Sequence, residues 1–209
     1  IKKNSNVLSS RTAMELRGVS CIDMETTSSK RKSCVVSRSF GKKVEKFQEL
    51  KEAIAGYSLN ASEKIRSESL VAKSITVFIR TSPFQSRYGF YSNSKTTDLP
   101  IATNNSIEIV KTALNALGAI FKNGYHYQKA GVMLSHLHEA SNSKNLFSSE
   151  RDEKINNLMK SIDNTNYKYG RSTLSLASAG VYKKWNSKRQ HYSKIDTADF
   201  YCLPKIKIS

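Results

Sequence analysis

The sequence predicts an α+β domain in which a four-stranded antiparallel sheet carries two helices on one face and leaves its other face open. Two observations predict it. Four short segments, either β-branched or alternating in hydropathy, are separated by two longer segments with an apolar residue at every third or fourth position. The segments follow the order β-α-β-β-α-β, which is the order of two split β-α-β units.

The first three elements follow from local pattern. Cys34–Phe40 is short and β-branched, which predicts a strand that ends at Gly41. Residues 44–67 carry an apolar stripe with helical spacing and therefore predict an amphipathic helix. Ser74–Arg80 alternates strictly, with apolar side chains at 75, 77 and 79, and predicts a half-buried strand.

The second half of the domain repeats this order. A third strand is predicted within residues 94–99, after a loop that contains Pro83. A second helix is predicted over Ser106–Lys122, with Ser106 as its N-cap and a Gly-containing turn after it. The fourth strand is predicted over Lys129–Leu137.

The regions on either side of this domain differ from it in composition. A helix over 7–17, closed by Gly18, has no partner segment before it, so we expect it to end a preceding domain of a longer chain. The C-terminal region is predicted to hold a short helix over 158–162 and small strands over 170–181. The predicted organisation is 1–18 as the end of a helix, 19–31 as a linker, 32–138 as the sheet domain, 139–149 as a polar linker and 150–209 as a separate small α+β module.

The chain is strongly basic. It has 34 Lys and Arg residues against 17 Asp and Glu, a formal net charge of +17. Because each cation placed on a phosphate releases condensed counterions, such an excess favours a polyanion as partner. The three cysteines are too few for a disulfide framework, and no apolar run is long enough to span a membrane. We therefore expect a cytoplasmic protein without a membrane partner.

Hydroxyl and cationic side chains gather on the predicted strands. Cations supply charge to a phosphate ladder, and hydroxyls set the register of the contact. Standing alone, these residues would indicate an ordinary polar strand face; the net charge and the open sheet face favour binding. The predicted phosphate-binding residues are Ser37, Arg38, Ser39, Lys42 and Lys43, with Lys73, Arg80, Thr81 and Lys129 as weaker members.

Other candidate sites are weaker. His136 and His138 would share one strand face, but no further ligand pair stands at metal-binding spacing. Trp185 could stack on a base, although a single Trp in a small domain more often belongs to its core. No P-loop, nucleophile elbow or carboxylate pair for two divalent metals is present, so we expect no active site in this segment.

Several blocks of residues together resemble one known family. They are Arg11–Gly18, Cys34–Gly41, Ile79–Phe84, Tyr127–Leu134, 169–174 and 185–189. In this order they are similar to the C-terminal half of the UmuC-type catalytic subunits of bacterial DNA polymerase V, which are Y-family translesion DNA polymerases.

The resemblance implies a division of labour. Residues 1–18 would end the thumb, 32–138 would form the little finger that holds primer–template DNA, and 150–209 would form the C-terminal domain particular to this subunit. The catalytic carboxylates and their Mg²⁺ would lie in a palm upstream of Ile1, so no cofactor is expected in this segment. The implied partners are the processed UmuD-type subunit and the recombinase filament, in the SOS response of a bacterial cell, close to the nucleoid.

The same resemblance implies a sliding-clamp peptide in the linker. The matching stretch is Ser143, Lys144, Asn145, Leu146 and Phe147. Its apolar pair is kept, but Ser143 stands where the family has a Gln that adds polar contacts to the groove. We therefore expect weak clamp binding.

Two alternatives to the polymerase hypothesis stay open at this point. One is a free-standing regulator that binds nucleic acid or the clamp without catalysis. The other is an RNA-binding ferredoxin-like module, which would use strand aromatics such as Phe40 and Phe78 to stack on bases.

Overall fold

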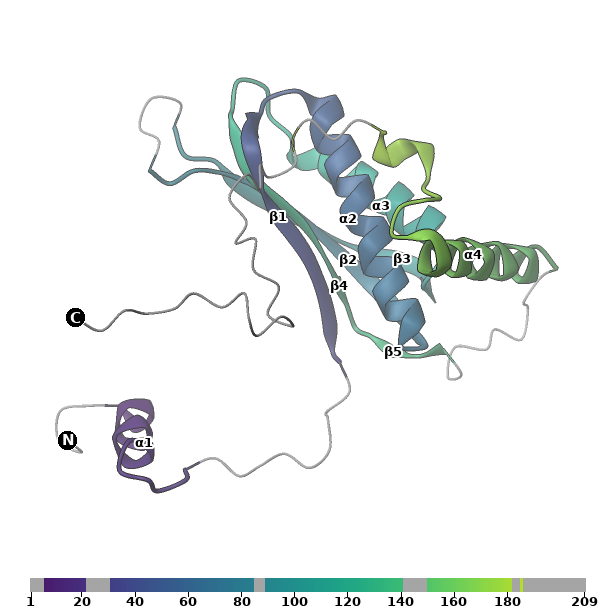
Figure 1. Cartoon of the computed structure of the whole chain (residues 1–209). Coiled ribbons are helices and arrows are strands. Elements are labelled where there is room, and N and C mark those ends of the chain that lie inside the picture. The colour runs from purple at the N-terminus through teal and green to yellow at the C-terminus, as the bar shows by residue number, and fades with distance from the viewer. Residues whose placement is uncertain (1–5, 22–30, 85–88, 141–149, 182–184, 186–209) are drawn as a thin grey trace, which may run out of the picture. The chain divides into compact units, whose positions relative to one another are not determined.

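A computed structural model describes residues 6–21, 31–84, 89–140, 150–181 and Trp185 (Figure 1). The chain divides into two compact units, Ile1–Arg31 and Lys32–Ser209. The first unit contains α1 (Val7–Glu15), none of whose side chains is buried. Gly18 adopts φ +81°, and the Val19 and Gly18 N–H groups donate to the carbonyls of Met14 and Glu15. This is the predicted glycine closure of the helix.

The second unit is built on an antiparallel sheet. Its strands are β1 (Ser33–Val44), β2 (Leu70–Thr81), β3 (Ser92–Thr103) and β4 (Tyr127–Ser135), in the spatial order β1-β4-β2-β3. A short β5 (His138–Glu139) pairs with the start of β2. Strand β4 lies between β1 and β2, and β2 lies between β3 and β4. The two β-α-β units are therefore split and interlocked, which confirms the predicted α+β fold.

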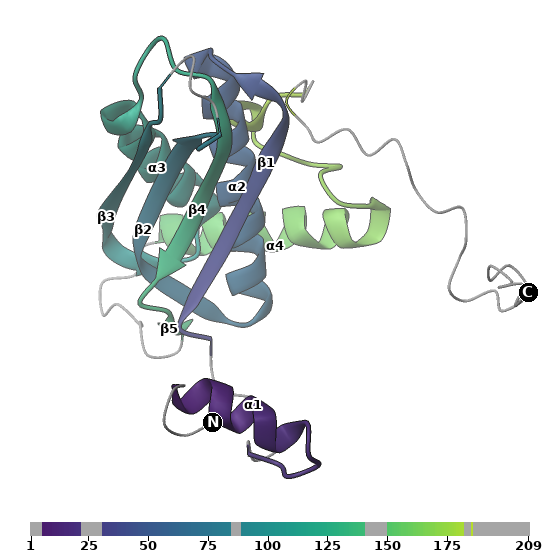
Figure 2. The ribbon, with the colours of Figure 1, turned by 90° about the vertical axis from the view of Figure 1, so that its left-hand side faces the viewer.

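The two helices that connect the strands lie on one face of the sheet (Figure 2). They are α2 (Phe47–Ser67), which connects β1 to β2, and α3 (Ser106–Ile120), which connects β3 to β4. The N-cap of α3 is Asn105 rather than the predicted Ser106: the Asn105 side chain accepts the Ile107 N–H at 3.0 Å. Within the described ranges, no helix combines the length and apolar character needed to cross a membrane.

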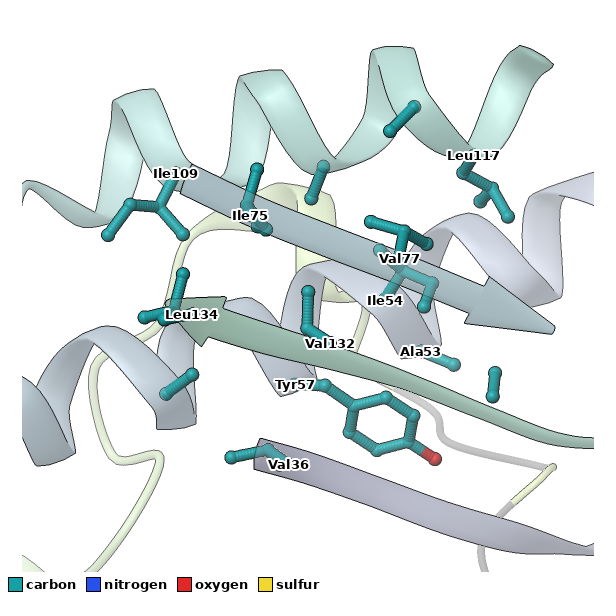
Figure 3. Close-up of a cluster of buried hydrophobic side chains, with 14 of the residues drawn as sticks. Val36, Ala53, Ile54, Tyr57, Ile75, Val77, Ile109, Leu117, Val132 and Leu134 are labelled. Atoms are coloured by element: carbon teal, nitrogen blue, oxygen red, sulfur yellow. The ribbon is translucent and has the colours of Figure 1, made fainter. Parts of the chain in front are cut away.

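The core lies between the helices and the sheet (Figure 3). Ile75, Val77 and Ile79 of β2 are fully buried, as their alternation predicts. They pack in one cluster with Val132 and Leu134 of β4 and with apolar side chains of α2 and α3. Burying a side chain of this size contributes about 1.5–3 kcal/mol, so this layer supplies much of the stability of the sheet domain.

The ends of two strands differ from the prediction. Strand β1 continues past Gly41 to Val44, because a bulge between Ser39 and Val44 absorbs the extra residues. Strand β4 ends at Ser135, because His136 adopts φ +53° and turns the chain. His138 then pairs with Val71 in β5. The prediction that His136 and His138 share one strand face is therefore wrong.

The C-terminal region also differs. A single helix, α4 (Glu150–Tyr169), replaces the short predicted helix, and a 3-10 turn, Ala177–Ala179, stands where small strands were predicted. Ala179 packs against Ala55 and Val110 of the two long helices. Trp185 is 6% exposed and belongs to the core of the sheet domain. Ala179 and Trp185 are thus buried against the sheet domain, whereas a separate module over 150–209 stays a prediction.

Gly131 is required by close packing across the sheet. A Cβ built on it would overlap Phe78 and Ser37, its partners on β2 and β1. Gly131→Ala should therefore destabilise the chain by about 1–3 kcal/mol, as overpacking does. Gly118→Ala is the matched control, because a Cβ there meets nothing within 4 Å on helix α3. It should stabilise the chain by about 0.5–1 kcal/mol. Urea unfolding of both variants measures the difference, and equal midpoints would contradict this packing.

Candidate nucleic-acid interface

The face of the sheet opposite the helices is polar. Cross-strand partners share a face, so residues in register with one another can be placed on it together. On each strand, the side chains of the fully buried residues and of their register partners point towards the helices. The side chains of the residues between these positions point away from the helices. The open face therefore carries Ser37 and Ser39 of β1, Lys129 and Met133 of β4, Thr76, Phe78 and Arg80 of β2, and Ser92, Ser94 and Thr96 of β3.

One row of this face crosses all four long strands. Lys129 is the register partner of both Ser39 and Arg80, and Arg80 is the partner of Ser92. Two cations therefore stand directly opposite each other on adjacent central strands, an arrangement that is destabilising in the absence of an anion. A phosphate placed between them would relieve the repulsion.

The surface is hollowed around this row. A shallow depression of about 470 Å³ is lined by Thr76, Phe78, Arg80, Ser92, Asn93, Ser94 and Lys129. The hydroxyl of the lining residue Thr76 is hydrogen-bonded at 2.8 Å to the hydroxyl of its register partner Thr96. The depression thus offers charged and neutral hydrogen-bond donors together, which is the mixture that phosphate and sugar oxygens accept.

Arg38 does not share the face of Ser37 and Ser39. Its register partners are Ala130 on β4 and, beyond it, Ile79 on β2, both fully buried on the helix side. The Arg38 side chain emerges at the exposed β1 edge, where its Nη1 donates to the Ser37 carbonyl at 3.2 Å. Ser37, Arg38 and Ser39 therefore do not form one set of hydrogen-bond donors on the same face. A DNA contact by Arg38 stays a prediction for the edge of the sheet.

The positive charge of Arg38 affects the pKa of a buried tyrosine, Tyr57. Burial raises the pKa of Tyr57 well above its usual value, and the nearby Arg38 guanidinium opposes this rise only in part. Burial also raises the pKa of Tyr127. Both phenols are therefore neutral at physiological pH and do not offset the positive charge of the sheet.

The remaining predicted lysines lie at irregular points. Lys42 and Lys43 are exposed within the β1 bulge, and Lys73 is exposed at a second bulge, between Ala72 and Ser74 of β2. Lys73 and Arg80 stand near opposite ends of β2. The predicted cations thus form a central pair, a β1 edge group and a distant single residue.

Thr81 is not available to a ligand. It is 2% exposed, and its hydroxyl accepts the Tyr91 N–H at 2.9 Å and lies 3.3 Å from the Tyr91 carbonyl, to which it donates. A register shift between Arg80 and Thr81 turns its side chain inward. The prediction that Thr81 donates to phosphate is therefore wrong.

Four hydroxyl residues of this face were missed by the sequence analysis: Thr76 on β2, and Ser92, Ser94 and Thr96 on β3. The β3 segment is polar on both sides and so has no hydropathy alternation to mark an outward face. Pro100 was a usable signal for an edge strand, where proline is tolerated. Only pairing with β2 assigns these residues to a face.

Comparison with known proteins identifies the family of the chain. Residues 31–146 match the model of the impB/mucB/samB family C-terminal domain. The chain belongs to this family. Residues 156–206 match a second model, described as a domain of unknown function, DUF4113. The resemblance carried by Cys34–Gly41 and Tyr127–Leu134 is thereby confirmed.

Several relatives match along the whole chain. Protein UmuC of Salmonella typhimurium is 34% identical over 209 residues, which are 99% of this chain and 50% of that protein. Protein ImpB of Salmonella typhimurium is 33% identical, over 100% of this chain and 49% of the relative. Protein MucB of Escherichia coli is 35% identical, over 98% and 48%. The chain spans about half the length of the curated relatives it matches.

Two solved polymerase structures match part of this chain. One is an insertion ternary complex of Dbh DNA polymerase, with 12% identity and a TM-score of 0.43 over 51% of this chain and 29% of that one. The other is a Y-family DNA polymerase chimera of Dbh and Dpo4, with 13% identity and a TM-score of 0.41 over 66% and 37%.

Two further expectations from the family resemblance concern other positions. The clamp-peptide residues Ser143–Phe147 lie outside the described residues. In the part of the chain that the structure describes, no group of three or more His, Cys, Asp or Glu side chains could hold a metal ion. The described side chains therefore do not fit the Mg²⁺ of a polymerase.

Thr81 provides a test of the inward-facing assignment. Thr81→Val keeps the side-chain shape but leaves the Tyr91 N–H without its acceptor, which should cost about 1–3 kcal/mol of stability. Urea unfolding measures this decrease. Binding to a polyanion such as heparin, measured well below the unfolding midpoint, should be unchanged. Weaker heparin binding with unaltered stability would show that the hydroxyl faces the ligand.

Proposed function

We propose that this chain is the C-terminal region of a Y-family translesion DNA polymerase and that the open face of its sheet binds the phosphate backbone of primer–template DNA. Membership of the impB/mucB/samB family supports the first part. The polymerase chemistry, with its carboxylates and Mg²⁺, would belong to another part of the full protein. The region described here would hold DNA during lesion bypass, in the cytoplasm and at the nucleoid.

The paired cations Arg80 and Lys129 carry the second part of the proposal. Their register places two positive charges side by side at the centre of the sheet face opposite α2 and α3. Serine and threonine hydroxyls surround them on three strands. Contacts of this kind bind phosphate and sugar oxygens and carry no base sequence. The face is therefore suited to DNA of any sequence, as a lesion-bypass polymerase requires.

Removing the central cations tests this face. Arg80→Ala with Lys129→Ala should weaken binding of the 209-residue chain to primer–template DNA, because two phosphates are no longer neutralised. On duplex DNA the log–log salt slope should become shallower by about 2, at about 0.9 for each phosphate. Fluorescence anisotropy over a salt series measures both quantities, and unrelated DNA sequences should give the same affinities.

The matched control is Lys64→Ala with Lys111→Ala. These two cations are exposed on α2 and α3, on the opposite side of the sheet, and their removal changes the net charge equally. The control pair should leave the slope almost unchanged. An equal decrease in affinity in both double variants would mean that net charge, and not the open face, binds DNA.

We further propose that residues 139–149 attach the region to the sliding clamp and that residues 150–209 contact the processed UmuD-type subunit and the recombinase filament. These partners come from the family resemblance. In the clamp peptide, Leu146 and Phe147 would be the buried anchors, since a short peptide draws its affinity from few side chains.

The clamp peptide can be tested in both directions. Leu146→Ala with Phe147→Ala should abolish binding to purified clamp in surface plasmon resonance and leave DNA affinity intact. Ser143→Gln restores the polar residue usual in the family and should strengthen clamp binding. If neither variant changes clamp binding, the segment is only a linker.

A further inference from the structure

The described residues 159–181 and Trp185 are here called the C-terminal strap. The second half of α4 lies across α2, and the segment after α4 continues towards the N-terminal half of α2 (Figures 1 and 2). Near the end of α2, Asp163 contacts Arg66. Farther back along the helix, Ala179 packs on Ala55, and Gly180 lies so close to Glu52 that a Cβ there would be 2.8 Å from the Glu52 carboxyl carbon. The strap thus follows the helix from its C-terminal turn towards its N-terminal half.

The strap has a polar anchor at its first end. Arg66 Nε and Nη2 donate to the two carboxylate oxygens of Asp163, at 2.7 and 2.8 Å. Arg66 Nη1 also donates to the Asn104 carbonyl and the Ser106 hydroxyl, both at 2.7 Å. The Arg66 side chain is only 12% exposed. Paired, partly buried bonds of this kind are stronger and more directional than a surface ion pair.

The strap has an aromatic anchor at its other end. The Trp185 ring meets Phe40 and Tyr57 edge-on, with ring centroids 6.0 and 5.7 Å apart. The Trp185 carbonyl accepts the Gly41 N–H at 3.1 Å. Phe40 and Gly41 belong to the β1 bulge, and the next two residues are Lys42 and Lys43.

The β1 bulge needs support from outside the sheet. Register between β1 and β4 is interrupted between the pairs Ser39–Lys129 and Val44–Tyr127, so the regular ladder does not hold the residues between them. Two hydrogen bonds replace it: the Gln128 side chain donates to the Phe40 carbonyl at 3.1 Å, and Gly41 donates to Trp185. Trp185 therefore supplies one of the two described hydrogen bonds and the ring packing that fix this bulge.

We propose that the C-terminal strap acts within its own chain on DNA binding: Trp185 is a positioning residue that fixes the β1 bulge and so holds Lys42 and Lys43 in place for the DNA backbone. The Arg66–Asp163 pair keeps the strap on α2, so that Trp185 reaches the bulge. The inference rests on the proposed function that this sheet domain binds DNA. On this proposal, the region that matches the domain of unknown function has a role in the sheet domain beside it, which is to fix the β1 bulge.

Docking of the strap can be followed directly, because Trp185 is the single Trp of the chain. In the full chain its fluorescence should be blue-shifted and protected from acrylamide. Asp163→Asn removes one carboxylate from the polar anchor and should raise the quenching constant of Trp185 at least about twofold. Glu153→Gln, which removes the same charge from an exposed position of α4, should not change it. Equal quenching in the Asp163→Asn variant and the unmodified chain would overturn the anchor.

The effect on DNA binding is tested with a double-mutant cycle. Trp185→Leu should weaken DNA binding, and so should Lys42→Ala with Lys43→Ala, by roughly fivefold for each phosphate that is no longer neutralised at about 0.15 M salt. If Trp185 acts through the lysines, the triple variant should bind no more weakly than the lysine pair. Trp185→Phe, which keeps an aromatic ring against Phe40, should restore most of the affinity.

Amide exchange separates positioning from unfolding. In Trp185→Leu the Gly41 amide should exchange faster, while amides in the paired centre of β2 and β4 stay protected. Affinity decreases that multiply in the triple variant, or an unchanged Gly41 amide, would overturn the inference. Absence of DNA binding by the unmodified chain would instead overturn the proposed function, and the fluorescence and exchange results distinguish the two failures.

Discussion

The pairing of β2 with β4 is the constraint on which the rest of the sheet domain depends. Val77 stands opposite Val132 at the centre of the sheet, and both are fully buried under the helices. Because side chains alternate along a strand, this one register sends Phe78, Gly131 and the Arg80–Lys129 row to the opposite face. A shift by one residue would place the two cations in the core and the valines in water.

The open face shows a conflict between stability and binding. Arg80 and Lys129 would be replaced by an opposite-charge pair if the sheet served stability alone, since like charges across a ladder repel. Gly131 also lacks a side chain for the sheet to pack, but it lets the Phe78 ring and Ser37 approach each other across β4. Both features belong to a positively charged, hollowed surface with the layer of helices on its other side.

The C-terminal region is a second case in which the tertiary structure shows packing that sequence similarity does not predict. Its match to a separate family model predicts an independent domain, and its size alone would give only a marginal core. In the described residues, its apolar side chains Ala179 and Trp185 are buried against the sheet domain instead. These two side chains thus share clusters with the sheet domain, and Trp185 contacts the β1 bulge.

The sequence by itself determined the order of elements in the sheet domain, the buried faces of β2, α2 and α3, and the glycine that closes α1. These features depend on neighbours along the chain, through hydropathy period and backbone propensity. It also identified the family, because several blocks of residues matched in order.

Only the tertiary structure decided the composition of the candidate interface. Arg38 falls on the helix side, Thr81 turns inward at a bulge, and Ser92, Ser94 and Thr96 join the open face. Trp185 and Asp163 meet residues more than 90 positions away in the chain. Strand register, bulges and long-range contacts arise from packing among distant segments, and a local sequence pattern does not predict them.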